Sequence, residues 1–317
     1  MSKLAVIAVG GNSLIKDDKN VTVEDQEQAL RETASHIANM IEAGWDLAIG
    51  HGNGPQVGFI LRRSEIAAKV EGMHEVPLDV CGADSQGAIG YEFQQALQNE
   101  YQRRGINKGA VTLVTQTLVD QKDPAFQKPS KPIGSFMDEP EAKRRERDMG
   151  WSVVEDAGRG WRRVVPSPLP KKILELESVK TLLHAGVTVI TVGGGGIPVV
   201  DKGNCEYVGT AAVIDKDFAS SLLAQEIGAE LFLIATAVEK VAINFGKPNQ
   251  QWLDRMTLAE AKQYLAEGTH FAKGSMAPKI QAIVWFLENG GTTALITNPE
   301  NIGRALKGET GTWIVKE

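Results

Sequence analysis

The sequence of 317 residues predicts an α/β fold in which helices cover both faces of a mostly parallel sheet. Short apolar runs of strand length alternate with amphipathic segments of helix length, as in parallel sheets with crossover helices. Three of the apolar runs, Leu4 to Val9, Leu47 to Ile49 and Val187 to Val192, end directly in glycine turns. Such turns at the carboxyl ends of parallel strands line the ligand crevice of open α/β sheets, so we expect a site there.

The glycine turns suit a charged ligand. Glycine lacks Cβ and adopts positive φ, so several glycines together let backbone N–H groups converge on an anion. The three turns are Gly10-Gly11-Asn12, Gly50 to Pro55 and Gly193 to Gly196. Glycines scattered for flexibility would not keep following strand patterns, and we therefore expect an anion site.

Composition restricts the class of protein. Hydrophobic residues make up 42% and charged residues 23%, values typical of globular chains rather than of disordered or membrane-spanning ones. With 34 basic and 40 acidic residues the net charge is −6, which argues against a nucleic-acid partner, because that needs a basic stripe. The run Leu4 to Val9 is too short for a signal-peptide core. We therefore expect a cytoplasmic protein that binds small molecules and no membrane.

The two cysteines indicate neither a disulfide framework nor a metal site. Cys81 and Cys205 lie far apart in the sequence, and neither has a second Cys or a His at metal-ligand spacing. We expect both thiols to be reduced and no metal to be bound by protein ligands alone.

Helix and strand signals follow one another along the chain. Thr22-Val23-Glu24-Asp25 resembles a capping box, which predicts a helix from there to Ala43, just before Gly44. After the second glycine turn, helices are predicted over 56–70 and 78–104. The later predicted elements are a strand over 110–114, a helix over 171–184, a strand over 187–192, a helix over 217–227, a strand over 231–235, helices over 258–266 and 276–288, a strand over 293–297, a short helix from Pro299 and a terminal strand around 313–315.

Residues 120–165 interrupt this alternation. They hold four of the 13 prolines and the charged run Glu141 to Asp148, and their ten basic and nine acidic residues give a local charge of +1. The rest of the chain then carries 24 basic and 31 acidic residues, or −7. Two interpretations are open: a solvated surface excursion, which the interleaved charges of the run favour, and a lid over an anionic substrate.

Four further segments place a lysine, an aspartate or both near an element boundary. Phosphoryl transfer needs cations and N–H donors around the transferred group rather than covalent help, and lysines beside glycine turns supply both. Asp217, at a predicted helix start, has two roles open to it: it caps the helix, or it orients lysines that would otherwise repel each other. The segments are 130–134 with Lys131, 213–217 with Lys216, 236–241 with Lys240, and 274–279 with Lys279.

Other nucleotide motifs are absent from the sequence. Gly10-Gly11 lacks the Gly-x-Gly-x-x-Gly spacing of dinucleotide sites, and no P-loop run occurs. His51, inside the second glycine turn, is a candidate general base, but no serine or cysteine nucleophile with an orienting acid lies nearby. A turn histidine that bonds to the backbone is the favoured interpretation.

Six motifs, in order along nearly the whole chain, resemble those of the carbamate kinases and, more loosely, the wider amino-acid kinase superfamily. They are Gly10-Gly11-Asn12, His51 to Gly58, Glu155 to Val165, Gly193 to Pro198, Ile214-Asp215-Lys216-Asp217 and Gly274-Ser275-Met276. The resemblance implies a single domain over 1–317, a three-layer α/β/α sandwich around a mainly parallel sheet, with a small protruding lid subdomain that corresponds to 120–165. It also implies a homodimer.

The resemblance further implies reversible phosphoryl transfer between ATP and carbamate, giving ADP and carbamoyl phosphate. Mg²⁺ would accompany the nucleotide, and we expect the direction that makes ATP. Alternatives that stay open are a superfamily kinase for another small acid and a non-catalytic paralogue that binds nucleotide or carbamoyl phosphate.

Residue roles carry over from the resemblance as expectations. Lys131 would reach in from the lid, Lys216 and Lys279 would stabilise transition-state charge, and Asp217 would organise the lysines. Acetylglutamate kinases have a lysine just before the first Gly-Gly turn, whereas this chain has Ala8-Val9, so Lys131 would substitute for that cation. The expected substrate-binding residues are Gly10, Gly11, Asn12, Gly52, Asn53 and Gly54. The expected nucleotide-binding residues are Gly194, Gly195, Lys216, Thr236, Ala237, Val238, Val241, Gly274, Ser275, Met276 and Lys279.

Overall fold

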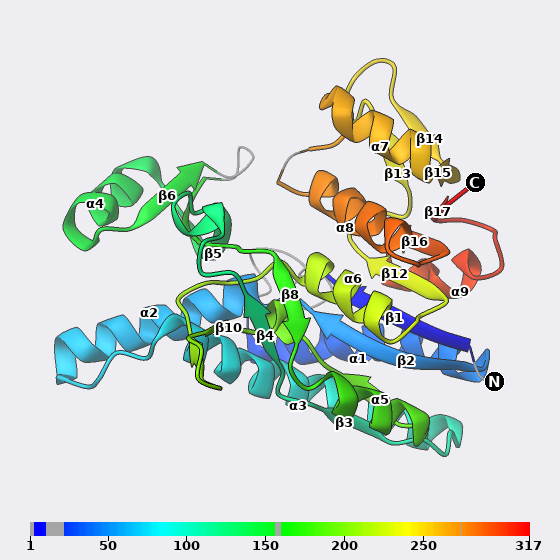
Figure 1. Cartoon of the computed structure of the whole chain (residues 1–317), viewed down its shortest axis with the longest axis horizontal. Coiled ribbons are helices and arrows are strands. Elements are labelled where there is room, and N and C mark those ends of the chain that lie inside the picture. Colours follow the sequence, from blue (N-terminus) through cyan, green and yellow to red (C-terminus); the bar gives the residue numbers. More distant parts are fainter. Residues whose placement is uncertain (1–2, 11–21, 156–159, 273) are drawn as a thin grey trace.

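A computed structural model describes residues 3–10, 22–155, 160–272 and 274–317 (Figure 1). The elements along the chain are β1 (Lys3–Val9), α1 (Val23–Glu42), β2 (Trp45–His51), α2 (Gly54–Glu71), α3 (Leu78–Arg104), β3 (Ala110–Thr112), β4 (Gln116–Val119), η2 (Pro124–Phe126), β5 (Lys131–Met137), α4 (Glu139–Met149), β6 (Ser152–Glu155), β7 (Trp161–Val165), β8 (Pro170–Ile173), α5 (Leu176–His184), β9 (Thr188–Ile190), η3 (Gly193–Gly195), β10 (Ile197–Asp201), β11 (Tyr207–Gly209), α6 (Lys216–Glu226), β12 (Leu231–Ala235), β13 (Val241–Ile243), β14 (Gln251–Leu253), β15 (Arg255–Thr257), α7 (Leu258–Glu267), α8 (Met276–Glu288), β16 (Thr293–Thr297), η4 (Pro299–Asn301), α9 (Ile302–Ala305) and β17 (Thr312–Val315).

The central sheet has eight strands in the order β15-β17-β16-β12-β1-β2-β9-β3. Neighbouring strands are parallel except β16 and β17, so the predicted mainly parallel sheet is confirmed. β1 lies between β12 and β2, with Val9 opposite Ala235 on one side and His51 on the other. The ends of these three strands therefore meet at one edge.

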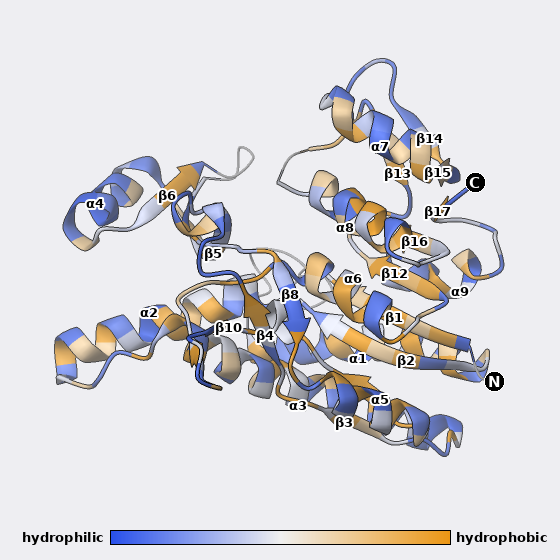
Figure 2. Ribbon diagram, viewed as in Figure 1, coloured by the Kyte–Doolittle hydropathy of each residue, from blue (hydrophilic) through white to orange (hydrophobic). Residues whose placement is uncertain are grey.

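Helices cover both faces of this sheet, which makes three layers (Figure 1). Alternate residues of β1 divide between two cores: Ala5 and Ile7 pack with α1, α3 and α9, whereas Val6 and Ala8 pack with α5, α6, α7 and α8. Strands buried on both faces are continuously apolar, and Figure 2 shows the central strands largely in the hydrophobic colour. No helix in the described part of the chain is long and apolar enough to cross a membrane.

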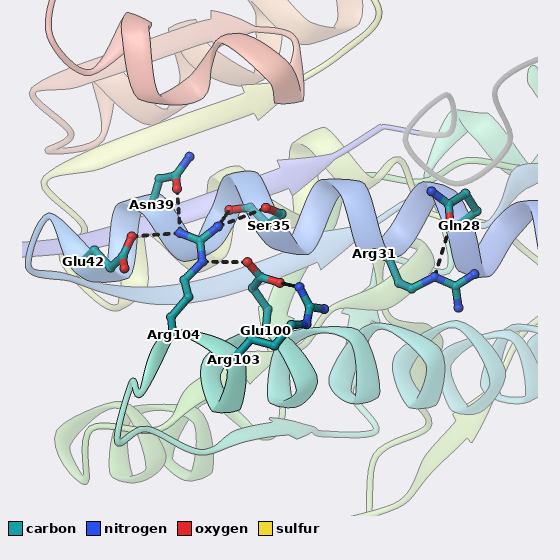
Figure 3. Close-up of polar contacts among 8 residues, drawn as sticks. All are labelled: Gln28, Arg31, Ser35, Asn39, Glu42, Glu100, Arg103 and Arg104. Atoms are coloured by element: carbon teal, nitrogen blue, oxygen red, sulfur yellow. Dashed lines mark hydrogen bonds and ion pairs between the residues drawn. The ribbon is translucent and has the colours of Figure 1, made fainter.

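A guanidinium group joins the long helices α1 and α3 (Figure 3). Arg104, at the end of α3, donates to Asn39 at 2.7 Å, to the carboxylate of Glu42 at 2.8 Å and to Ser35 at 2.8 and 2.9 Å, all on α1. Its Nε donates to Glu100 at 2.6 Å. These bonds fix two neighbouring helices of one outer layer against each other.

A second sheet, β11-β10-β4-β8, corrects part of the sequence prediction. The helix expected over 171–184 begins only at Leu176, because Pro170 to Ile173 form β8, antiparallel to β4. Four residues are too few to reveal strand periodicity beside a helical segment. The short strands β4, β10 and β11, and the hairpin of β13 and β14, likewise have no counterpart among the predicted elements.

A small subdomain occupies residues 131–165, within the irregular stretch. It consists of the antiparallel sheet β5-β7-β6 and helix α4, which stand away from the central sheet in Figure 1. The charged run lies on α4, where Ala142 is the buried residue, so most of that helix is solvated. The guanidinium groups of Arg145 and Arg163 both lie over the Trp151 ring, 4.9 and 4.5 Å from its centroid.

The subdomain is attached through a close backbone contact between α2 and β5. A Cβ on Gly58 would overlap the backbone N and Cα of Gly134, and Gly134 itself has φ +70°. Ile133 and Val165 from the subdomain bury their side chains beside Val57 of α2. Glycine at 58 therefore decides how closely β5, and with it Lys131, approaches the body of the protein.

The second and third glycine turns are also in contact with each other. A Cβ on Gly193 would overlap the imidazole of His51, and one on Gly194 would overlap the amide of Asn53. Gln86 of α3 holds the third turn in place, because its side-chain amide donates to the carbonyl oxygen of Gly193 at 2.9 Å. Glycine is needed in the third turn because a Cβ at Gly193 or Gly194 would overlap a side chain of the second turn. The second and third turns are therefore packed against each other.

Gly58→Ala should lower the free energy of unfolding by about 1–3 kcal/mol, because its methyl group meets backbone that cannot rotate away. Hydrogen exchange in β5 should accelerate as the subdomain loosens. Gly303→Ala on α9 is the control, since its Cβ would meet its nearest neighbour at an ordinary 3.8 Å. Equal stabilities of the two variants in chemical denaturation would contradict the proposed attachment.

Candidate active site

A cleft of about 460 Å³ lies where the carboxyl ends of the central strands meet the small subdomain. Three groups of residues line it. The glycine turns contribute Gly52, Asn53, Gly54, Pro55 and Gly194; the segments around β5, β7 and the loop after β7 contribute Ser130, Lys131, Pro132, Arg162, Ser167, Pro168 and Leu169; and the starts of α6 and α8 contribute Ile214, Asp215, Lys216, Asp217, Phe218, Gly274, Ser275, Pro278, Lys279 and Gln281.

Charged side chains converge in this cleft from three distant parts of the chain. The two carboxylate oxygens of Asp217 each accept from a lysine, Lys216 Nζ at 2.5 Å and Lys279 Nζ at 3.0 Å. Beside them, Lys131 Nζ from β5 donates to Asp215 at 2.6 Å. The structure thus brings together the four residues that were expected to be catalytic.

The two aspartates at the start of α6 have different hydrogen-bond partners. Asp215 is the N-cap of the helix, and its carboxylate accepts from the backbone N–H of Asp217 at 2.8 Å. Asp217 is therefore free of the capping role that was open to it. Its carboxylate, only 2% exposed as a residue, turns instead to the lysines.

Burial and charge act against each other on these groups. Burial alone would raise the pKa of Asp217, but Lys216 and Lys279 hold that pKa below its ordinary value. Burial lowers the pKa of Lys216, and Asp217 offsets part of this effect. For Lys279 the aspartates outweigh burial and raise the pKa. Asp217 thus favours the charged form of both lysines.

The cleft carries net positive charge. Three lysines and Arg162 face two aspartates among its lining residues, so the formal sum is 4 − 2 = +2. The helices α2 and α8 also begin here, and the N-cap residue of neither helix, Asn53 or Ser275, makes a side-chain capping bond. Uncapped helix N-termini add partial positive charge, so the cleft is suited to polyanions.

Histidine 51 takes no part in this charge cluster. Its ring is buried, and Nδ1 lies 3.0 Å from the carbonyl oxygen of Gly52. Burial lowers the pKa of His51 to about 4, with the Gly52 contact acting in the opposite direction. The favoured interpretation of a turn histidine bonded to the backbone agrees with this geometry.

Some of the glycine N–H groups in the three turns already donate to acceptors within the protein. Those of Gly10 and Gly52 donate to the carbonyls of Ala235 and Val9, and the N–H of Gly195 donates within its own turn. These donors are engaged by protein acceptors. Gly52, Asn53, Gly54 and Gly194 line the cleft, Gly195 is not among its lining residues, and Gly11 and Asn12 lie outside the described residues.

The expected nucleotide contacts divide into two groups. Gly194, Gly274, Ser275, Lys216 and Lys279 line the cleft, and Met276 begins α8 beside it, partly buried against the core. Apart from Gly195, the remaining residues follow β12 and lie outside the cleft lining. They are Thr236, Ala237, Val238 and Val241; the side chain of Val241 is fully buried, and its N–H donates to Thr312 Oγ1 at 2.8 Å.

Two charged cleft residues were not assigned a role from the sequence, although both lie in quoted motifs. Asp215 holds Lys131, and the Asp-x-Asp spacing at a helix start was the signal that could have identified it. Arg162 lines the cleft from β7, with its guanidinium 5.1 Å from the centroid of the Phe136 ring. Its place follows from strand pairing that the sequence pattern did not reveal.

Within the described ranges, no group of three or more His, Cys, Asp or Glu side chains could hold a metal ion. Cys81 and Cys205 are both free thiols, and burial raises the pKa of Cys81 to about 11. The charged side chains that line the cleft are three lysines, an arginine and two aspartates, and helix N-termini lie beside them; phosphoryl transfer uses cations and N–H donors of this kind.

Comparison with known proteins agrees with this geometry. The model of the amino acid kinase family matches residues 3–298. Carbamate kinase from Thermococcus kodakarensis is 49% identical over 99% of this chain and 100% of its own length, and the carbamate kinase-like protein YahI of Escherichia coli is 50% identical over both full lengths. The structure of carbamate kinase from Giardia lamblia bound to AMP-PNP has a TM-score of 0.90 and 42% identity over 100% of this chain and 99% of that one. The chain therefore belongs to the amino acid kinase family.

Proposed function

We propose that the protein is a carbamate kinase, which transfers a phosphoryl group between ATP and carbamate and makes ATP from carbamoyl phosphate and ADP. The observation that carries this proposal is the buried Lys216–Asp217–Lys279 cluster beside the Lys131–Asp215 pair in a cleft of net positive charge. Full-length relatives named carbamate kinase support the choice of substrate.

The cluster suits in-line transfer between two anionic oxygens. Charge spreads over the transferred phosphoryl group in the transition state, and fixed cations stabilise that charge without having to reorganise. Lys216 and Lys279 are held by Asp217, and Lys131 is held by Asp215, so all three ammonium groups are positioned before substrate arrives. Gly52, Asn53 and Gly54 would bind the acceptor, and Gly194, Gly274 and Ser275 the nucleotide.

Magnesium would enter with the nucleotide. The cleft aspartates, Asp215 and Asp217, already accept from lysines, and this fits an ion held mainly by phosphate oxygens and water with at most one or two carboxylates. When bound, Mg²⁺ neutralises phosphate charge. Positioning of the phosphoryl group remains the task of the lysines.

We further propose that residues 120–165 form a lid. Lys131 and Arg162 both come from the small subdomain, so its movement would bring two cations to the cleft or remove them. The single domain over 1–317 and a cytoplasmic location belong to the same proposal.

A homodimer is proposed from the family resemblance, and exposed apolar side chains are the candidates for its interface. Val70, Met73 and Tyr91, on α2, the segment after it and α3, are 69%, 57% and 62% exposed. Light scattering should give a molar mass of twice 34.2 kDa. Val70→Lys should shift the mass toward the monomer, and a wild-type chain that stays monomeric at micromolar concentration would exclude the dimer.

ATP formation from ADP and carbamoyl phosphate, measured with Mg²⁺ and with the ion omitted, tests the function. Lys279→Ala should lower kcat by about 10²–10³-fold, because it removes a cation that stabilises transition-state charge. Lys262→Ala is the control, since that exposed lysine pairs with Glu288 on the surface. Near-normal turnover by Lys279→Ala would contradict the assignment. A wild type that binds ADP without turnover would indicate a non-catalytic paralogue. A wild type that makes ATP only from another acyl phosphate would indicate a kinase for a different small acid.

A further inference from the structure

The side chain of Asn53 has an unusual orientation for its position. Asn53 is the N-cap of α2, where an asparagine normally uses Oδ1 to accept an N–H of the first helical turn. Here it makes no such bond. Instead, its Nδ2 donates to Ser85 Oγ on α3 at 2.8 Å, and the residue is 5% exposed while lining the cleft.

Ser85 decides which end of that amide points toward it. Its side chain is fully buried, and its single hydroxyl proton goes to the carbonyl oxygen of Gly82 at 2.7 Å. The oxygen of Ser85 can then only accept a further bond, so it selects the Nδ2 end of Asn53. Gly194 touches the same amide, because a Cβ on that glycine would overlap it. The amide is thus fixed by a hydrogen bond and by packing.

This orientation leaves an acceptor for the ligand. Among the residues that the structure describes, Oδ1 of Asn53 has no hydrogen-bond partner. A carboxylate or phosphate oxygen would require a donor in that place, since two acceptors repel each other. An amine N–H would form a bond, and the amine is the group that distinguishes carbamate and carbamoyl phosphate from carboxylates and acyl phosphates of the same shape.

We propose that Ser85 is a positioning residue that presents Asn53 Oδ1 to the amine of carbamate and carbamoyl phosphate, and so determines specificity for an N–H over a methyl group. The inference rests on the proposed function and deepens it. Acetyl phosphate is the matched probe, because a methyl group replaces the amine while the rest of the molecule keeps its shape. A site that bonds a ligand N–H rejects the analogue that lacks it, because the buried acceptor is left unpaired.

The test compares ATP formation from carbamoyl phosphate and from acetyl phosphate in Ser85→Ala and in a control. Ser221→Ala is that control: Ser221 is equally buried, donates to the carbonyl of Ala282 at 2.8 Å and accepts from the amide of Gln225 at 3.1 Å. Both changes delete the same two kinds of hydrogen bond. Thermal unfolding of both variants reports any general destabilisation.

Ser85→Ala should lower kcat/KM for carbamoyl phosphate about tenfold or more and that for acetyl phosphate about twofold or less, so the ratio of the two falls. The ratio of Ser221→Ala should equal that of the wild type. If acetyl phosphate turnover is undetectable, its inhibition constant against carbamoyl phosphate replaces its kcat/KM. If Ser85→Ala does not fold, Ser85→Cys keeps the shape with a weaker acceptor and should lower the ratio in the same direction.

An equal fall for both substrates would make Ser85 purely structural and overturn the inference. An unchanged ratio in a folded Ser85 variant, with an active wild type, would overturn it while the proposed function stands. A wild type that makes no ATP from carbamoyl phosphate would overturn the function and the inference together.

Discussion

The cleft depends on one buried carboxylate shared by two lysines. Asp217 is 2% exposed, and its two oxygens hold Lys216 at 2.5 Å and Lys279 at 3.0 Å. An isolated buried carboxylate would cost several kcal/mol. If Asp217 paired with only one of the two lysines, the other lysine would be left without that partner. The two ion pairs therefore require the starts of α6 and α8, which are about sixty residues apart in sequence, to meet at the same point.

Close backbone packing makes this meeting possible. Gly195 touches Ile214 just before α6, Gly194 touches Asn53 before α2, and Gly58 touches the subdomain strand that carries Lys131. Larger residues at these positions would separate the elements that carry the charges. The glycines therefore act mainly by permitting close approach, and the cations provide the charge complementarity.

The sequence predicted the features that depend on local pattern, and it missed those that depend on pairing between distant segments. Strands such as Leu231 to Ala235 and helices such as Leu78 to Arg104 have long, regular patterns, and the structure has them with the same bounds. β8 is four residues long and is defined by its partner β4, so no local signal marked it. The pairing of Asp215 with Lys131 and the hydrogen bond between Asn53 and Ser85 are tertiary contacts that residue identity alone does not specify.

The central claim is that Asp217 keeps the lysines of the cleft protonated, and the pH profile of kcat in Asp217→Asn tests it most directly. Burial and Lys279 lower the pKa of Lys216, while Asp217 and Asp215 raise it, so loss of the Asp217 charge must lower it further. The descending limb, where a required lysine loses its proton as pH rises, should move to lower pH. Lys131 faces Asp215, and that carboxylate remains in the variant. A descending limb that stays in place, in a variant that unfolds at the wild-type temperature, would contradict the account.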